Sequence, residues 1–307
     1  MKKMKKSINH LSSIGFGAAP LGGLYGNAVG EKEASLMIRE ALAANITFFD
    51  TSPYYNNSEI CLGNALKGIP RDTYALCTKG GRISEDIFDF SPKTLNTNFE
   101  RSLKRLNTDY VDVFLLHDVE FVDDSNFNSV IMETALPYLY ENFKKNGKAL
   151  LIGFSCLPLS TIENALAHPN SKLIDIILTY SHNTLVDNTL NTIKTQLDNN
   201  DILLLDASLF NMGLLTTNGG PEWHPVPPIL KKACKKIVEE LQKNNSSLTL
   251  EQIALSYAYR NCIASCMIVG CRTLNELRDN IFTIKNHCDK NQIIEENVKQ
   301  YIFNQLI

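Results

Sequence analysis

Four residues that can carry or steer a proton stand at or just after the ends of short apolar segments. They are Asp50, Tyr55, Lys79 and His117. Packing alone seldom puts charged groups at the ends of buried segments, because such groups are costly to bury. We therefore take these four residues as a candidate catalytic group.

The residue types indicate proton transfer at an oxygen atom. A free tyrosine has a pKa near 10 and is a poor base, but an adjacent lysine ammonium lowers the pKa of the phenol by favouring the phenolate. A carboxylate beside the lysine would hold its charge and position, and a histidine opposite could orient the reacting oxygen. The set offers no nucleophile and no metal site. Proton transfer at a carbinol oxygen then implies hydride transfer at its carbon, so we expect NAD or NADP as cofactor.

The elements that position these residues follow a repeated strand–helix pattern. Expected strands are 14–17, 46–50, 74–79, 111–117, 150–155, 174–180, 202–207 and 267–270, and expected helices are 31–44, 92–106, 136–146, 159–167, 190–198 and 250–261. Short apolar strands alternating with helices indicate a parallel sheet covered by helices. Eight such units predict a closed (β/α)8 TIM barrel, with an open doubly wound sheet as the alternative.

Two segments fall outside the repeat. Residues 210–228 are too rich in Gly and Pro for a helix, and a loop of this length usually has a function. It contains Trp223 and His224, which could either brace the loop or contact a substrate. We favour substrate contact, and we expect the same of Tyr54 and His117. Residues 292–303 predict an extra C-terminal helix, and we expect one domain over residues 1–307.

Composition excludes several classes of function. A net charge of −3 argues against nucleic-acid binding, and no apolar stretch approaches the roughly 20 residues of a membrane span. The four lysines within residues 1–6 precede no apolar segment, so we interpret them as a solvated tail. The eight cysteines form no CxxC pair or metal-binding pattern, which favours reduced thiols. We expect a cytoplasmic protein with a small-molecule substrate, neither nucleic-acid nor membrane partners, and a monomeric or weakly homo-oligomeric state.

The cofactor is not held by a Rossmann fingerprint. Residues 15–20 are glycine-rich, but Pro20 stands where the third glycine should be. A different arrangement must therefore bind the dinucleotide.

Several motifs resemble those of the aldo-keto reductases, in register over nearly the whole chain. They are residues 48–55, 58–59, 62–63, 78–79, 115–118, 152–155, 212–216 and 270–273 with Asn280. The resemblance implies a (β/α)8 barrel that binds NAD(P) without a Rossmann domain, with Asp50, Tyr55, Lys79 and His117 as catalytic residues. It also implies cofactor contacts at Ser155, Ser208, Gly213, Leu214, Gly270, Arg272, Thr273, Glu276 and Asn280.

A narrower resemblance is to the L-galactose dehydrogenase branch of that family. Residues 48–55, 117–121, 157–159 and 220–225 carry it. This branch implies NAD-linked oxidation of an aldose, such as L-galactose, L-fucose or D-arabinose, at C1 to a lactone. Two alternatives are a broad NADPH-dependent aldehyde or ketone reductase and a nicotinamide-binding regulatory subunit.

The chain departs from the family pattern around the expected nicotinamide. Cys156 replaces the usual asparagine, Ile177 or Leu178 replaces a glutamine, and Ala207 replaces a stacking tyrosine. After the last strand, the carboxylate of Glu276 would repel a 2′-phosphate and could accept a bond from a ribose hydroxyl. Arg272 could instead pair with a phosphate. We expect NAD to be preferred over NADP.

Overall fold

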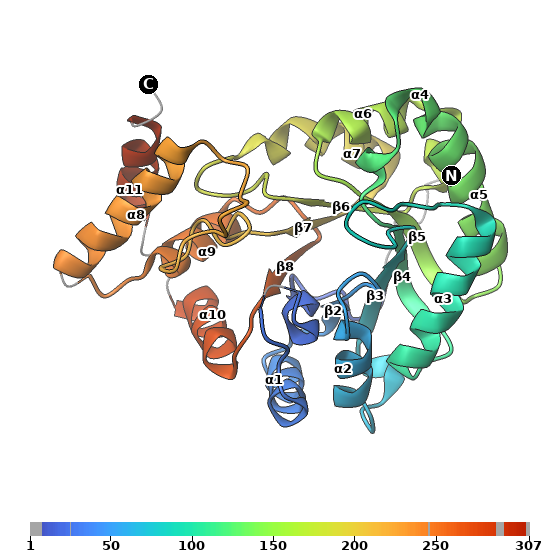
Figure 1. The fold of residues 1–307 in the computed structure, drawn as a ribbon, viewed down its shortest axis with the longest axis horizontal. Helices are drawn as coiled ribbons and strands as arrows, with labels where there is room; N and C mark the ends of the chain where they lie inside the picture. The colour runs from blue at the N-terminus through green and yellow to red at the C-terminus, as the bar shows by residue number, and fades with distance from the viewer. Residues whose placement is uncertain (1–7, 25, 245, 287–291, 305–307) are drawn as a thin grey trace.

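The computed structural model describes residues 8–24, 26–244, 246–286 and 292–304 (Figure 1). The expected solvated tail, residues 1–6, lies outside the described residues. None of the described helices has the length and apolar content that crossing a membrane requires.

Eight parallel strands close into a barrel in sequence order, and β1 pairs with β8. The strands are β1 (Ile14–Gly17), β2 (Phe48–Asp50), β3 (Ala75–Gly80), β4 (Val111–Leu116), β5 (Ala149–Ser155), β6 (Ile176–Tyr180), β7 (Leu203–Ala207) and β8 (Cys266–Gly270). The barrel prediction is therefore confirmed, and the open doubly wound sheet is excluded by the closure between the first and last strands.

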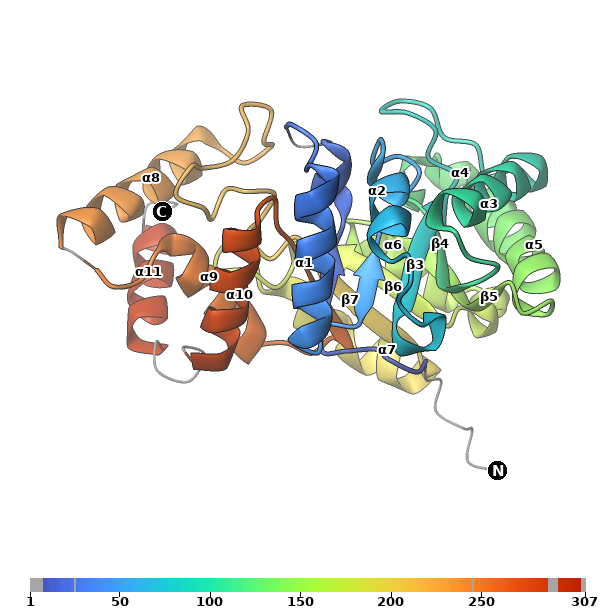
Figure 2. The same cartoon turned by 90° about the horizontal axis from the view of Figure 1, so that it is seen from below.

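Helices surround the barrel wall, and α9, α10, α1, α2 and α3 follow one another around it (Figure 2). Their bounds are α1 (Glu31–Ala43), α2 (Ser58–Ala65), α3 (Pro92–Leu106), α4 (Asp124–Phe127), α5 (Leu136–Leu139), α6 (Leu159–Ala167), α7 (Lys194–Asn200), α8 (Pro228–Lys243), α9 (Leu250–Arg260), α10 (Leu274–Asn286) and α11 (Gln292–Asn304). Local signals set several ends. Ser91 caps α3 ahead of Pro92, and Thr249 with Gln252 forms a capping box on α9.

Three expected elements differ in extent. The helix expected at 136–146 is the end of a longer helix that runs over 124–144. In this longer helix, π-helical turns at 128–135 join α4 to α5, and further π-helical turns at 140–144 follow α5. Pro137 lies within it and lacks the N–H of a regular helical bond, which favours wider turns nearby. The helix expected at 190–198 is divided into a 3-10 turn, Thr189–Ile193, and α7. The loop expected to reach Pro228 ends at Pro227, because Pro228 begins α8 at a position that needs no N–H donor.

Three apolar clusters hold the molecule together. One fills the barrel interior, with Phe48, Val113 and Leu115 among its members, and a larger one lies between strands and helices. The third lies beside the barrel, where α8, α9 and α11 pack on one another at one side of the molecule (Figure 1). Because most strand positions are buried among apolar side chains, the polar residues at the carboxyl ends of the strands form a separate group.

Candidate active site

The four candidate catalytic residues come together at the carboxyl ends of neighbouring strands. Asp50 ends β2, Lys79 is the next-to-last residue of β3, and His117 follows β4. Tyr55 lies in the turn between β2 and α2. A closed parallel barrel brings consecutive strand ends to the same rim, which is why residues far apart in sequence meet here.

Lys79 and Asp50 form a buried ion pair. Nζ of Lys79 lies 2.6 and 2.8 Å from the two carboxylate oxygens of Asp50 and donates to the carbonyl oxygen of Thr51 at 3.0 Å. The lysine side chain is 1% exposed. These three oxygens replace the hydrogen bonds that the ammonium would make with water. The Nζ of Lys79 lies 5.0 Å from the centroid of the Tyr55 ring, so the ammonium lies beside the phenol ring.

His117 is buried between Ser52, Tyr55 and Asp118. Its Nδ1 lies 2.9 Å from the Ser52 hydroxyl oxygen, and its Nε2 lies 3.5 Å from the Tyr55 hydroxyl and 3.6 Å from Oδ2 of Asp118. Burial lowers the pKa of His117 to about 3, against the opposing effect of Asp118 and with help from the positive charges of Lys79 and Arg82. The imidazole is therefore neutral at neutral pH and can act as a hydrogen-bond donor without carrying charge.

Tyr54 stands beside this group under the guanidinium of Arg82. The Tyr54 ring lies 5.9 Å from the His117 ring, and Arg82 lies 3.8 Å above the Tyr54 ring and donates to its hydroxyl at 3.1 Å. Arg82 also pairs with Asp118 at 2.5 Å. The structure thus places Tyr54 next to the four, as the sequence led us to expect, and fixes it there through a cation that the sequence reasoning missed.

A second polar group lies on the rim at β5 and β6. Glu120 accepts the backbone N–H of Leu157 at 2.8 Å and the hydroxyl of Tyr180 at 3.3 Å, while its other oxygen, Oε2, is buried without a hydrogen bond. Burial, and then the charge of Asp118, raises the pKa of Glu120 to about 7. Sequence reasoning missed both Glu120 and Tyr180, although Tyr180 ends an expected strand.

The two residues of the long loop differ in exposure. Trp223 is 63% exposed, whereas His224 is 4% exposed. The imidazole of His224 hydrogen-bonds within the loop, from Nε2 to the carbonyl oxygen of Asn211 at 2.8 Å and at Nδ1 from the N–H of Val226 at 3.3 Å. Both ring nitrogens of His224 thus hydrogen-bond within the loop, and substrate contact by His224 stays a prediction. Trp223 remains available for contact.

Four of the expected cofactor residues already have partners within the chain. The hydroxyl oxygen of Ser155 accepts the N–H of Asp118 at 2.9 Å and lies 3.3 Å from its carboxylate, and that of Ser208 accepts the N–H of Met212 at 2.9 Å. The backbone N–H groups of Gly213 and Leu214 close turns onto Phe210 and Asn211. The hydroxyls of Ser155 and Ser208 and the backbone N–H groups of Gly213 and Leu214 are therefore already hydrogen-bonded within the chain.

The other five lie together at the end of β8 and the first turns of α10. Glu276 accepts the N–H of Arg272 at 2.6 Å, and Thr273 accepts the N–H of Glu276 at 3.1 Å. Glu33, which arrives from α1, accepts the N–H of Leu274 at 3.2 Å. Two carboxylates therefore occupy the start of α10. No signal in the sequence identified Glu33.

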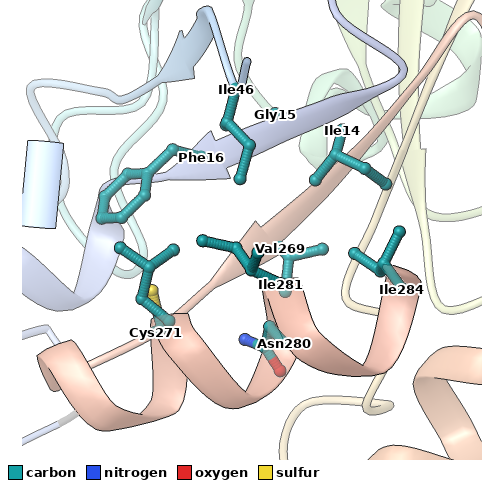
Figure 3. Close-up of a pocket in the computed structure, with 10 residues that line it drawn as sticks. Ile14, Gly15, Phe16, Ile46, Val269, Cys271, Asn280, Ile281 and Ile284 are labelled. Atoms are coloured by element: carbon teal, nitrogen blue, oxygen red, sulfur yellow. The ribbon is translucent and has the colours of Figure 1, made fainter. Parts of the chain in front are cut away.

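Residues at this end of the barrel fit a dinucleotide. Gly270 and the Arg272 side chain are exposed, and Arg272 lies over Gly26 of the loop between β1 and α1. In the described part of the chain, the guanidinium of Arg272 has no carboxylate partner, and the half-buried amide of Asn280 makes no hydrogen bond. Figure 3 shows Asn280 on α10 beside the apolar seam that α10 forms with β1 and β8.

Among the residues that the structure describes, no cluster of His, Cys, Asp or Glu could hold a metal.

Comparison with known proteins agrees with this geometry. The aldo/keto reductase family model matches residues 13–296. L-galactose dehydrogenase from Arabidopsis thaliana is 37% identical, covering 89% of this chain and 84% of its own. D-arabinose 1-dehydrogenase from Saccharomyces cerevisiae is 29% identical, covering 87% and 82%. A solved aldo-keto reductase from Bacillus halodurans, 22% identical, superimposes with a TM-score of 0.72 over 96% of this chain and 92% of its own, which shows the shared fold. The chain therefore belongs to the aldo/keto reductase family.

Proposed function

We propose that this protein is an NAD-dependent aldose 1-dehydrogenase, which oxidises an aldose such as L-galactose at C1 to the lactone. The observation that carries the proposal is the buried Lys79–Asp50 pair beside Tyr55, opposite a neutral His117. This arrangement places a proton acceptor, a fixed positive charge and an uncharged hydrogen-bond donor around one point on the rim. Those are the groups that removal of a hydroxyl proton requires.

Each residue has a distinct part in the reaction. Tyr55 takes the proton of the anomeric hydroxyl, and the ammonium of Lys79 stabilises the phenolate form that accepts it. Asp50 holds Lys79 in place through the buried ion pair between them. His117 orients the sugar oxygen. The coenzyme, when bound, supplies the hydride acceptor.

The preference for NAD rests on the carboxylates at the start of α10. Glu33 and Glu276 both accept backbone N–H groups there, at 3.2 and 2.6 Å. The N-terminus of a helix otherwise attracts phosphate, so two carboxylates at this place disfavour the 2′-phosphate of NADP. Arg272 remains for the pyrophosphate that NAD and NADP share, and the amide of Asn280 remains for hydrogen bonding to the nucleotide.

Two observations support a sugar as the substrate: the names of related enzymes, and the exposed Trp223 of the long loop. The names of two relatives describe an L-galactose dehydrogenase and a D-arabinose 1-dehydrogenase, both of which act on sugars. Trp223, 63% exposed, offers the flat apolar surface on which the C–H face of a sugar packs. We propose Tyr54, His117 and Trp223 as substrate contacts.

The test is absorbance at the reduced-nicotinamide band, with NAD or NADP and a panel containing L-galactose, L-fucose and D-arabinose. We expect reduction of NAD by at least one aldose. Tyr55→Phe should lower turnover by about a hundredfold or more while binding NAD as before. Oxidation of NADPH by simple aldehydes without any aldose activity would favour the reductase. Coenzyme binding without any turnover would favour a regulatory subunit.

A further inference from the structure

Ser52 lies directly behind the imidazole of His117. It follows β2 by two positions and is 1% exposed. Its hydroxyl oxygen lies 2.9 Å from Nδ1 of His117 and accepts the backbone N–H of Tyr54 at 3.1 Å. These contacts join the segment that carries Tyr55 to the ring that faces it.

The hydrogens on Ser52 can be assigned by counting donors. A backbone N–H can only donate, so Tyr54 uses the oxygen of Ser52 as an acceptor. If Nδ1 of His117 also donated to that oxygen, the single hydroxyl hydrogen would have no acceptor among the described residues. A buried donor without an acceptor is costly. The hydroxyl of Ser52 therefore donates, and Nδ1 accepts.

The other side of the ring gives the same answer independently. Oδ2 of Asp118 lies 3.6 Å from Nε2 of His117, and a carboxylate favours an N–H over a nitrogen lone pair facing it. Arg82 contacts the same Oδ2 at 2.5 Å and anchors Asp118 in that place. Because the imidazole is neutral, only one nitrogen carries hydrogen, and both lines of reasoning assign it to Nε2.

We infer that Ser52 is a positioning residue that locks His117 as the Nε2–H tautomer. The hydrogen of Nε2 then points to the place beside the Tyr55 hydroxyl, 3.5 Å away, that the reacting oxygen must enter. Without the hydroxyl of Ser52, the proton can move to Nδ1, and the reacting oxygen would meet a lone pair. The catalytic part of this inference rests on the proposed function, whereas the tautomer itself does not.

The tautomer is tested by 15N NMR of the full chain labelled at histidine, without substrate. The His117 signals are identified by their loss in His117→Gln. We expect a pyrrole-type Nε2 and a pyridine-type Nδ1 in the unchanged protein, and a shift of both signals toward each other or to the opposite pattern in Ser52→Ala. A pyrrole-type Nδ1 in the unchanged protein, or an identical pattern in Ser52→Ala, overturns the inference whether or not an aldose is ever oxidised.

The consequence for the reaction is tested by kinetics with whichever substrate the protein turns over. Ser52→Ala should lower kcat about tenfold, the loss expected for one orienting hydrogen bond, with a smaller change in KM. Ser52→Thr retains a hydroxyl and should keep both the 15N pattern and most of kcat. Ser256→Ala, which removes a buried α9 hydroxyl that has no hydrogen bond, is the matched control and should change neither. A fall in kcat with the 15N pattern unchanged, or a changed pattern at full kcat, overturns the proposed role.

Discussion

At the level of single residues, Lys79, His117 and Glu120 lie on one rim among different hydrogen-bond partners. Lys79 meets three oxygens within 3.0 Å, which replace its water. His117 has no comparable set of acceptors, and its pKa falls to about 3 because desolvation disfavours the charged ring. Glu120 has one buried oxygen without a partner, and its pKa rises to about 7. Burial thus favours the uncharged form of both His117 and Glu120, which lowers the pKa of the base and raises the pKa of the acid.

Glu120 should make stability depend on pH in a direction opposite to that of a paired carboxylate. Below pH 4.5 it is protonated in both the folded and the unfolded chain. Between pH 4.5 and pH 7 the unfolded chain ionises first, so the free energy of unfolding falls as pH rises, and above pH 7 the loss is complete. Glu120→Gln cannot ionise. The free energy of unfolding of Glu120→Gln, relative to that of the unchanged protein, should therefore be higher by roughly 1 to 3 kcal/mol above pH 7 than below pH 4.5.

Thermal unfolding at the two pH values measures this difference. Glu222→Gln changes an exposed carboxylate of the long loop and serves as the control, with a difference from the unchanged protein that should not vary with pH. If the stability difference between Glu120→Gln and the unchanged protein is equal at both pH values, the role assigned to the ionisation of Glu120 is contradicted.

At the scale of elements, the approach of β5 to β6 depends on a glycine. Gly153 pairs with Ile176 in the barrel register, and a Cβ placed on Gly153 would lie 1.7 Å from the carbonyl oxygen of Ile176. That contact is with backbone, which cannot turn aside as a long side chain can. The close approach fixes the rim at β5 and β6, where Glu120 joins Leu157 to Tyr180.

Gly153→Ala should therefore force the two strands apart, and we expect a loss of about 3 kcal/mol or more in the free energy of unfolding. Urea unfolding measures this loss. The matched control is Gly270→Ala, in another barrel strand, where the nearest atom to a new Cβ is 3.5 Å away, an ordinary contact. Its change should stay under about 1 kcal/mol. Equal stability of the two variants would show that the β5–β6 seam can relax.

At the scale of the molecule, the cluster of α8, α9 and α11 forms a second core beside the barrel. Ile302 of α11 is fully buried in it, and Leu214 and Leu215 of the long loop belong to the same cluster. Lys299 also donates to the hydroxyl of Tyr257 at 3.0 Å, and Arg260 pairs with Glu295. The loop that carries Trp223 is thus anchored to an apolar core outside the barrel.

Ile302→Ala should loosen this second core while leaving the barrel closed. We expect a local loss of about 2 to 5 kcal/mol from the cavity, seen as faster amide hydrogen exchange in α11, α8 and residues 208–227. The strands should keep their protection. Gln300→Ala, at an exposed position of the same helix, is the control and should leave exchange unchanged. Faster exchange across all eight strands would show instead that both cores unfold as one unit.

The order of apolar and polar residues was enough to predict the alternation of strands and helices, and with it the barrel. It also identified Asp50, Tyr55, Lys79 and His117, because each stands at or just after a strand end, and the ends of parallel strands must meet. Local spacing was sufficient for these inferences. The helix ends at 136–146 and 190–198 were less well predicted, because π and 3-10 turns continue or divide a helix without a change in its apolar pattern.

The contacts of the neighbouring residues could be read from the three-dimensional structure but not from the sequence. Glu33 reaches the N–H of Leu274 across 241 positions of sequence, and Ser52 reaches His117 across 65. Ser155 is bonded to Asp118, and His224 braces its loop, although their types equally suited contacts with cofactor or substrate. A hydrogen bond depends on the position and burial of both partners, and residues distant in sequence acquire these only when the barrel closes.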